Sequence, residues 1–268
     1  MIRKYKFFSY LILITVSIFS VFPLYWMVIA ATNESIDVIR GRLIPGKALL
    51  DNINKLFMQY QVKEALANSF RNAFILTLAS LLICSLAGYG FEVFHDKWKD
   101  RVMKIILVAM MVPFVAMMIP LYQMFAKAKL LNTTLGFILP TISTPFLIML
   151  FRQSARSFPL EIIEAARMDG LSEFQIFIRM FIPTMKSTYA AAMTITFMGA
   201  WNSYLWPKVI MTDGTSTTMP MLIANLKEGY VTDYGVLMLA VLLCTLPTAI
   251  LFFLLQNSFA DGVTGAVK

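Results

Sequence analysis

The sequence has 268 residues, of which 59% are hydrophobic and only 14% are charged. Soluble domains usually carry about a quarter of charged residues, so this composition excludes an ordinary soluble domain and predicts side chains that face lipid. The net charge is +8, but the basic residues lie between apolar runs and form no stripe with interleaved aromatic residues. This distribution favours membrane topology over nucleic-acid binding.

Six apolar runs without charged residues follow one another along the chain. Each has about the 20 residues that an α-helix needs to cross about 30 Å of hydrocarbon. A membrane barrel would instead show alternation in segments of about ten residues. We therefore predict an all-α, polytopic membrane protein with six transmembrane helices. The runs are residues 7–31, 72–91, 105–126, 130–151, 187–207 and 235–258.

The basic residues also indicate the orientation of these helices. The N-terminus, residues 92–104, residues 152–186 and the C-terminal tail together carry 13 Lys and Arg residues, against 10 in the segments on the opposite side. Because loops that stay inside are enriched in Lys and Arg, the count predicts a multi-pass membrane protein with both termini inside. The first run exceeds the 7 to 15 residues of a signal-peptide core, so we expect it to remain in the protein.

Prolines interrupt several of the runs. Pro113 and Pro120 lie in the third run, and Pro140 and Pro145 lie in the fourth. Each proline removes a backbone donor, and neighbouring helices or water must then satisfy the freed carbonyl groups. Such helices suit a bundle around a cavity.

The sequence contains no convincing energy source or catalytic centre. Residues 41–47 read GRLIPGK, which has the spacing of a phosphate-binding loop, but Ala48 lacks the Mg²⁺-binding hydroxyl and Pro45 lacks a backbone N–H. We predict a turn there. The six runs hold no ionisable residue, which disfavours a proton- or sodium-coupled carrier. We also expect no metal site, cofactor or catalytic group in this chain, because it has no cluster of His, Cys and carboxylate residues.

Residues 152–186 form the most informative polar segment. Ser157 and Pro159 are typical of a helix start, and Gly170 is typical of its end. Ser172 and Gln175 then form a capping box that begins a second helix, predicted to end near residue 183. Two short helices with a tight turn between them could be held by a partner protein. The alternative is an amphipathic pair that rests on lipid headgroups.

Five residues at the end of the first of these helices are candidates for contact with a partner. Ala165 and Ala166 are small enough for the helix backbone to approach another surface. Glu164 and Asp169 offer carboxylates to basic side chains, and Gly170 provides the turn.

The same segment resembles a known sequence motif. Residues 164–170 read EAARMDG and are followed by MFIP at 180–183, which resembles the cytoplasmic EAA loop of ABC importer permeases, E-A-A-x3-G-x9-I-x-L-P. Met and Ile replace the usual Ile and Leu. Further stretches resemble the carbohydrate-uptake branch of that family, in particular its second, maltose G-type subunit. These are residues 22–26, 111–113, 119–122, 131–133, 201–207 and 262–267.

The resemblance implies a type I importer fold in three parts. Residues 1–68 would hold the first transmembrane helix and an extracytoplasmic segment, residues 69–257 the permease core with the EAA loop at 152–186, and residues 258–268 a cytoplasmic tail.

The resemblance also implies a function and a set of partners. In the bacterial inner membrane, the chain would form half of the pathway for uptake of a sugar or sugar derivative. It would pair with a second, similar permease, two ATPase subunits that bind ATP and Mg²⁺, and an extracytoplasmic solute-binding protein. The EAA loop would contact an ATPase, and so would the tail through Gly262, Thr264 and Gly265. The alternatives are a stand-alone secondary carrier and a membrane transferase.

The residues that contact the solute are harder to identify from sequence. Sugar sites often combine aromatic faces with amide groups, so Trp201, Asn202, Tyr204, Tyr122 and Gln123 are candidates. Aromatic residues near the ends of membrane helices also form interfacial belts, which is the alternative interpretation. A disaccharide, an oligosaccharide, glycerol phosphate and sialic acid all remain open as solutes.

Overall fold

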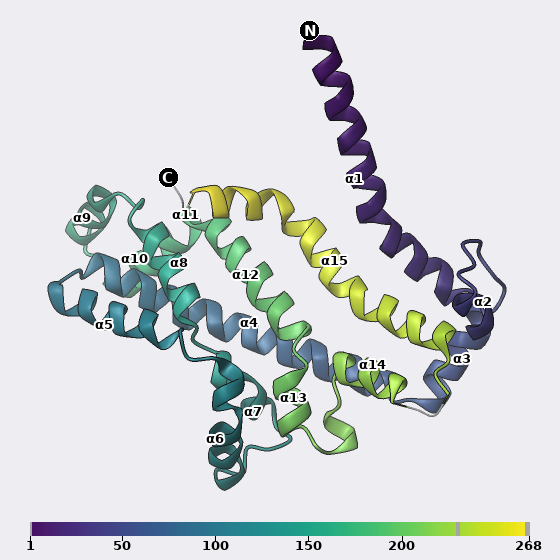
Figure 1. Cartoon of the computed structure of the whole chain (residues 1–268). Helices are drawn as coiled ribbons and strands as arrows, with labels where there is room; N and C mark the ends of the chain where they lie inside the picture. The colour runs from purple at the N-terminus through teal and green to yellow at the C-terminus, as the bar shows by residue number, and fades with distance from the viewer. Residues whose placement is uncertain (1, 229–230, 266–268) are drawn as a thin grey trace. The chain divides into compact units, whose positions relative to one another are not determined.

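The computed structural model describes residues 2–228 and 231–265, and the side chains of residues 8–228 and 231–257. The described residues form helices and connecting loops without a β-strand, which confirms the predicted all-α fold (Figure 1). The elements are α1 (Ile2–Ala31), α2 (Ser35–Ile39), α3 (Leu49–Gln59), α4 (Val62–Val93), α5 (Lys97–Ala109), α6 (Phe114–Lys127), α7 (Thr134–Ile138), η1 (Leu139–Thr141), α8 (Pro145–Ala155), α9 (Leu160–Met168), α10 (Glu173–Ile176), η2 (Phe177–Phe181), α11 (Ile182–Thr184), α12 (Lys186–Trp201), α13 (Leu205–Ile210), η3 (Gly214–Ser216), α14 (Met219–Lys227) and α15 (Tyr234–Gly265).

Three helices are long and apolar enough to cross a membrane by themselves, namely α1, α4 and α15. Two further spans arise if each bent helix pair counts as one: α5 with α6, bent by 96°, and the segment Thr134–Thr141 with α8, bent by 56°. The fifth predicted run forms α12, which has 16 residues and falls short of the roughly 20 needed to span. The structure is consistent with six spans, but the sixth stays a prediction.

Prolines mark both bends. Pro113 lies between α5 and α6, and Pro140 and Pro145 flank the bend between η1 and α8. At the second bend, the freed Ile142 carbonyl accepts a hydrogen bond of 2.8 Å from Ser80 Oγ on α4. A neighbouring helix therefore satisfies the interrupted backbone, as membrane burial requires.

The chain forms two compact units. One consists of the residues up to Leu66 together with Met219–Pro247. Within it, the buried Asn52 side chain donates hydrogen bonds of 3.0 Å to the carbonyls of Ala31 and Asn33, which ties α3 to the end of α1. Further back along α1, the side chains of residues 8–24 are all exposed.

The other unit consists of Ala67–Thr218 together with residues 248–268. Its core packs α4, α5, α8 and α12 around Cys84, Met103, Phe151 and Ala192. Gly88 on α4 lets this core close, because a Cβ atom at residue 88 would lie 2.6 Å from Phe151 Cβ and 2.7 Å from the Arg152 backbone nitrogen. The backbone of α4 thus approaches α8 closely at Gly88, because α4 has no side chain at this contact.

Candidate functional site

The loop between α8 and α12 contains the two predicted short helices. The first is α9, which is followed by Asp169 at its C-cap and then by Gly170 with a φ of +81°. That backbone conformation is open to glycine at no steric cost, and the Leu171 N–H then donates to the Ala166 carbonyl at 3.0 Å. The second helix begins with the predicted capping box, in which Ser172 and Gln175 exchange side chain to backbone hydrogen bonds of 2.9 and 3.4 Å. The predicted turn and capping box are both confirmed.

The five candidate partner contacts on α9 divide between two faces. Glu164, Ala165, Asp169 and Gly170 are exposed. Ala166 is instead 1% exposed and belongs to a buried apolar cluster of the chain itself. Its small side chain allows α9 to approach its own core, so in this structure Ala166 is not available to another protein.

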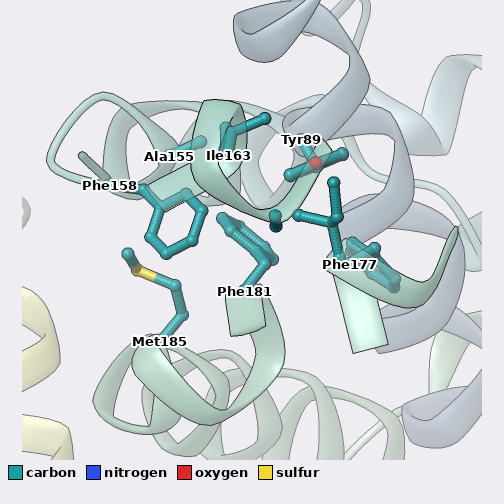
Figure 2. Close-up of a cluster of buried hydrophobic side chains, with 9 residues drawn as sticks. Tyr89, Ala155, Phe158, Ile163, Phe177, Phe181 and Met185 are labelled. Atoms are coloured by element: carbon teal, nitrogen blue, oxygen red, sulfur yellow. The ribbon is translucent and has the colours of Figure 1, made fainter. Parts of the chain in front are cut away.

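The apolar cluster beneath α9 contains four aromatic side chains among its nine buried residues (Figure 2). Tyr89, from the last turns of α4, lies 5.4 Å from the ring of Phe177 and 5.0 Å from that of Phe181. Phe177 and Phe181 belong to η2, a π-helical turn, and their rings stack 5.6 Å apart. Phe158, just before α9, packs edge-on against Phe181. The cluster attaches the loop to α4.

Polar contacts support this attachment. Glu173, at the start of α10, accepts a hydrogen bond of 2.6 Å from Arg167 Nε on α9 and one of 3.5 Å from the Tyr89 hydroxyl. The first of these contacts raises the pKa of the Arg167 guanidinium. The two short helices are therefore joined across the Gly170 turn by a charged hydrogen bond as well as by apolar packing.

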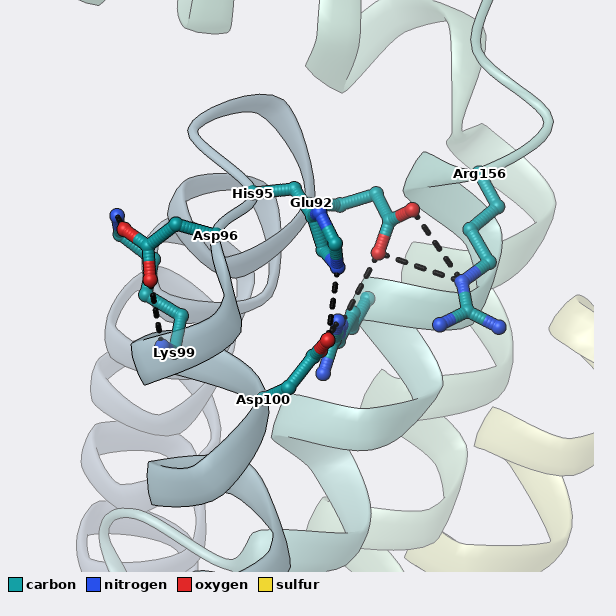
Figure 3. A network of polar contacts seen from close by, with 7 residues as sticks. Glu92, His95, Asp96, Lys99, Asp100 and Arg156 are labelled. Atoms are coloured by element: carbon teal, nitrogen blue, oxygen red, sulfur yellow. Dashed lines mark hydrogen bonds and ion pairs between the residues drawn. The ribbon is translucent and has the colours of Figure 1, made fainter.

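A group of ion pairs lies where this loop leaves α8 (Figure 3). Arg152 donates to Glu92 at 3.0 Å and to Asp100 at 2.6 Å, and its side chain is only 8% exposed. Arg156 Nε lies 3.3 Å from both oxygens of Glu92, and His95 Nε2 lies 3.0 Å from Asp100. We call these five residues the Arg152 cluster. Sequence analysis did not identify it, because its members come from three separate helix ends.

A cavity of about 500 Å³ lies in the same compact unit, beside the bend between η1 and α8. None of the described residues that line it is charged. Its walls are mainly apolar, with a few hydroxyl groups, and Gly199 of α12 has open space in place of a side chain. The lining residues are Leu76, Met110, Phe114, Phe137, Thr141, Thr144, Phe146, Leu147, Ile195, Thr196, Gly199, Ala200, Ser203 and Trp206.

None of the five candidate solute contacts lines this cavity. Trp201 is 1% exposed and packs between Phe70 and Phe197, so it belongs to the protein core. Tyr122, Gln123 and Asn202 are exposed, and Tyr204 is half-buried, so contact of these four with a solute stays a prediction.

The signal that could have found the cavity is the proline pair of the fourth run. Pro140 and Pro145 break the helix, and Thr141 and Thr144 line the cavity beside that break. Transporter sites are often built at interrupted helices, because non-helical backbone at membrane depth is tolerated only where protein or a cavity borders it. One hydroxyl in the wall, Thr196 Oγ1, makes no hydrogen bond to the described residues.

Comparison with known proteins identifies the family of the chain. Residues 80–265 match the family described as "Binding-protein-dependent transport system inner membrane component". The chain belongs to this family. It is therefore a multi-pass inner-membrane component of a transport system, which rules against a membrane transferase and favours dependence on a binding protein over a stand-alone carrier.

Relatives of this inner-membrane component match over nearly their whole length. The chain is 44% identical over 260 residues to the lactose transport system permease protein LacG of Rhizobium radiobacter, covering 97% of this chain and 95% of LacG. It is 31% identical over 259 residues to the arabinooligosaccharides transport system permease protein AraQ of Halalkalibacterium halodurans, covering 94% and 93%. It is also 31% identical over 271 residues to the sn-glycerol-3-phosphate transport system permease protein UgpE of Escherichia coli, covering 97% and 96%.

The fold of this inner-membrane component also matches a solved structure. The comparison with a chain of a bacterial ABC transporter involved in the import of the acidic polysaccharide alginate gives a TM-score of 0.83 at 19% identity, over 96% of this chain and 97% of that one. At this identity the likeness concerns the fold. The predicted importer-permease fold is thereby confirmed.

Two stretches that supported the resemblance in sequence have structural roles. Asn132 adopts a φ of +59°, and its side-chain oxygen accepts hydrogen bonds from the backbone N–H groups of Thr212 and Asp213 at 2.6 and 3.3 Å. Trp206 donates its indole N–H to the Gly136 carbonyl at 3.0 Å. Both contacts hold the segment after α12 against the segment around α7, so these residues position backbone beside the cavity.

The remaining predictions concern the first loop and the tail. Residues 41–47 form a turn at Gly41, with a φ of +71°, and a Cβ atom at Gly46 would lie 2.6 Å from the Thr32 carbonyl oxygen. Both glycines therefore have conformational roles.

At the C-terminal end, α15 continues to Gly265, so the backbone of Gly262, Thr264 and Gly265 is helical. The Thr264 side chain and residues 266–268 lie outside the described part.

Proposed function

We propose that this chain is the permease subunit of an ATP-driven importer and forms half of the membrane pathway for a sugar. The observation that carries the proposal is the family match together with 44% identity to a lactose permease over 97% of the chain. Its partners would be a second, similar permease, two ATPase subunits that bind ATP and Mg²⁺, and an extracytoplasmic solute-binding protein.

The lining of the cavity favours a neutral solute over a charged one. The three relatives are named for lactose, arabino-oligosaccharides and a glycerol phosphate. A phosphate would be held by Arg, Lys or backbone donors, and the described lining of the cavity carries no charged side chain. The lining combines aromatic rings such as Phe114 and Phe146 with the hydroxyls of Thr196 and Ser203, and such surfaces suit the C–H faces and hydroxyls of a sugar ring. Lactose is therefore our first candidate.

The exposed face of α9 supports coupling to an ATPase. Glu164, Ala165 and Asp169 are exposed on it, and the neighbouring Met168 side chain is 88% exposed. An apolar side chain flanked by carboxylates suits a cleft with basic residues at its rim. We propose that this face binds an ATPase on the cytoplasmic side, where both termini would also lie.

Uptake by the reconstituted complex tests the proposal. The chain would be purified with a candidate second permease, ATPase and binding protein from the same organism, and the complex would be placed in proteoliposomes filled with ATP. We expect accumulation of labelled lactose that requires ATP and every partner, and we expect no accumulation of sn-glycerol-3-phosphate. Lactose accumulation by this chain alone under a pH gradient would instead establish the secondary-carrier alternative.

A matched pair of variants in the same assay tests the cavity. Gly199→Leu places a side chain in the cavity without touching other atoms at Cβ, whereas Gly199→Ala adds one methyl group. If solute passes through the cavity, the leucine variant should lower uptake about tenfold because its side chain fills space that the solute needs, while the alanine variant stays near wild type. Equal uptake by both variants would place the solute elsewhere.

A further inference from the structure

The Arg152 cluster joins three helices that all reach the cavity. Glu92 is in the last turn of α4, Asp100 is in the first turn of α5, and Arg152 is in the last turn of α8. At 1.5 Å per residue, the ten residues from Asp100 to the cavity wall at Met110 span about 15 Å. The cavity residues at or beside these three helices include Leu76, Met110, Phe146 and Leu147.

The cluster also lies at the base of the loop that carries α9. Arg152 and Arg156 precede the start of α9 at Leu160 by only eight and four residues. One turn before Glu92, Gly88 lets the backbones of α4 and α8 touch. Backbone packing and ion pairs therefore fix α4 to α8 at the same end, directly next to the loop.

The chemistry of the cluster suits a rigid joint. A guanidinium is planar and can bind two carboxylates at once, which the ammonium of lysine does with less directional control. Arg152 uses this property to connect α4 with α5 through Glu92 and Asp100. Glu92 lies at a helix C-terminus, where the helix dipole disfavours a negative charge. The arginines, and not its own helix, stabilise the carboxylate in this position.

We propose that the Arg152 cluster transmits movement of the α9 loop to the walls of the cavity. This inference rests on the proposed function, since it requires an ATPase that moves α9. With the cluster intact, a displacement of α9 carries the ends of α4, α5 and α8 together and so reshapes the cavity. With the cluster broken, only apolar contacts hold α8 to α5, and less of the movement that ATP hydrolysis drives reaches the cavity.

Asp100→Asn tests the joint with little risk to the fold, because the Asp100 side chain is 39% exposed. The matched control is Asp96→Asn in the same helix. Asp96 pairs with Lys99 only three residues away, so its ion pair joins no separate helices, and asparagine preserves its helix cap. Both variants would be reconstituted as the full complex, and the number of solute molecules taken up per ATP hydrolysed would be measured together with the amount of ATPase bound.

We expect Asp100→Asn to lower uptake per ATP about threefold to tenfold, because asparagine keeps an acceptor oxygen for Arg152 but loses the negative charge. ATPase binding and hydrolysis should be retained. Glu92→Gln should act in the same direction, and Arg152→Lys should fall between Asp100→Asn and wild type. Asp96→Asn should match wild type. If uptake per ATP is unchanged in both Asp100→Asn and Glu92→Gln, the inference is overturned. It is also overturned if uptake falls only in proportion to the loss of bound ATPase. A wild-type complex without ATP-dependent uptake would instead reject the proposed function itself.

Discussion

Gly88 and Gly90 are two residues apart on α4 and have different surroundings. A methyl group on Gly88 would meet the backbone of α8 at 2.7 Å, whereas one on Gly90 would meet no atom within 4 Å. Alanine has a higher helix propensity than glycine, which favours Gly88→Ala and Gly90→Ala equally, by about 1 kcal/mol. The difference between the two variants therefore isolates the helix contact.

We expect Gly88→Ala to destabilise the protein by about 1–3 kcal/mol through overpacking, and Gly90→Ala to leave stability unchanged or raise it by up to about 1 kcal/mol. Chemical denaturation of the purified chain in detergent, followed by circular dichroism, measures both. Equal stability of the two variants would show that α4 and α8 separate easily at this point.

The structural roles of some single residues could be predicted from the sequence, and those of others could not. The turn at Gly170 and the capping box of Ser172 and Gln175 were predictable, because their partners lie within a few residues along the chain. The close contact at Gly88 depends on Phe151, and the position of Asp100 depends on Arg152. Such pairs are joined by the fold alone, so no local pattern indicates them.

The π-helical turn η2 shows the same limit for a whole element. The capping box and Pro183 predicted a regular helix from residue 173. The structure instead has four α-helical residues, then the five of η2, which place Phe177 and Phe181 against Tyr89. Since Tyr89 lies on α4, far away in sequence, the spacing of the two phenylalanines did not reveal the change in helix type.

The turn between α9 and α10 allows the loop to be tested by conformation alone. Gly170 has a φ of +81° and open space at Cβ, so a side chain meets no neighbour but must accept the left-handed backbone. Asparagine tolerates that region, whereas valine in it costs about 1–2 kcal/mol. We expect Gly170→Asn to preserve, and Gly170→Val to reduce, both co-purification of the ATPase and its stimulation by loaded binding protein.

Neither substitution changes charge, so a difference between them reports the geometry of the turn. If both variants behave as wild type in both measurements, the loop does not bind the ATPase through this turn, and the alternative in which the helix pair rests on lipid headgroups gains support.

For the whole molecule, orientation in the membrane is the testable property. The Lys and Arg count predicts that residues 152–186 lie inside and residues 32–71 outside. A reporter that is active only in the cytoplasm should function when fused after Ala166 and fail when fused after Asn54. The reverse pattern would invert the assignment and place α9 on the side where no ATPase could reach it.

The division into two compact units could not be predicted from the sequence. Apolar runs of sufficient length predicted the helices, because lipid imposes that length on each run separately. The first unit, however, combines the residues up to Leu66 with Met219–Pro247. Its polar connections, such as Lys55 with Asp233 at 3.1 Å, join residues 178 apart in sequence. The pattern of charge and hydropathy along the chain does not indicate which distant residues pair.

The bare outer surface of α1 bears on how the chain is synthesised. Side chains 8–24 are exposed throughout, so this stretch makes no buried contact with the later residues that the structure describes. It can therefore enter the bilayer by hydropathy alone, before the rest of the chain has left the ribosome. We therefore expect a message truncated after the first helix still to yield a fragment anchored in the membrane.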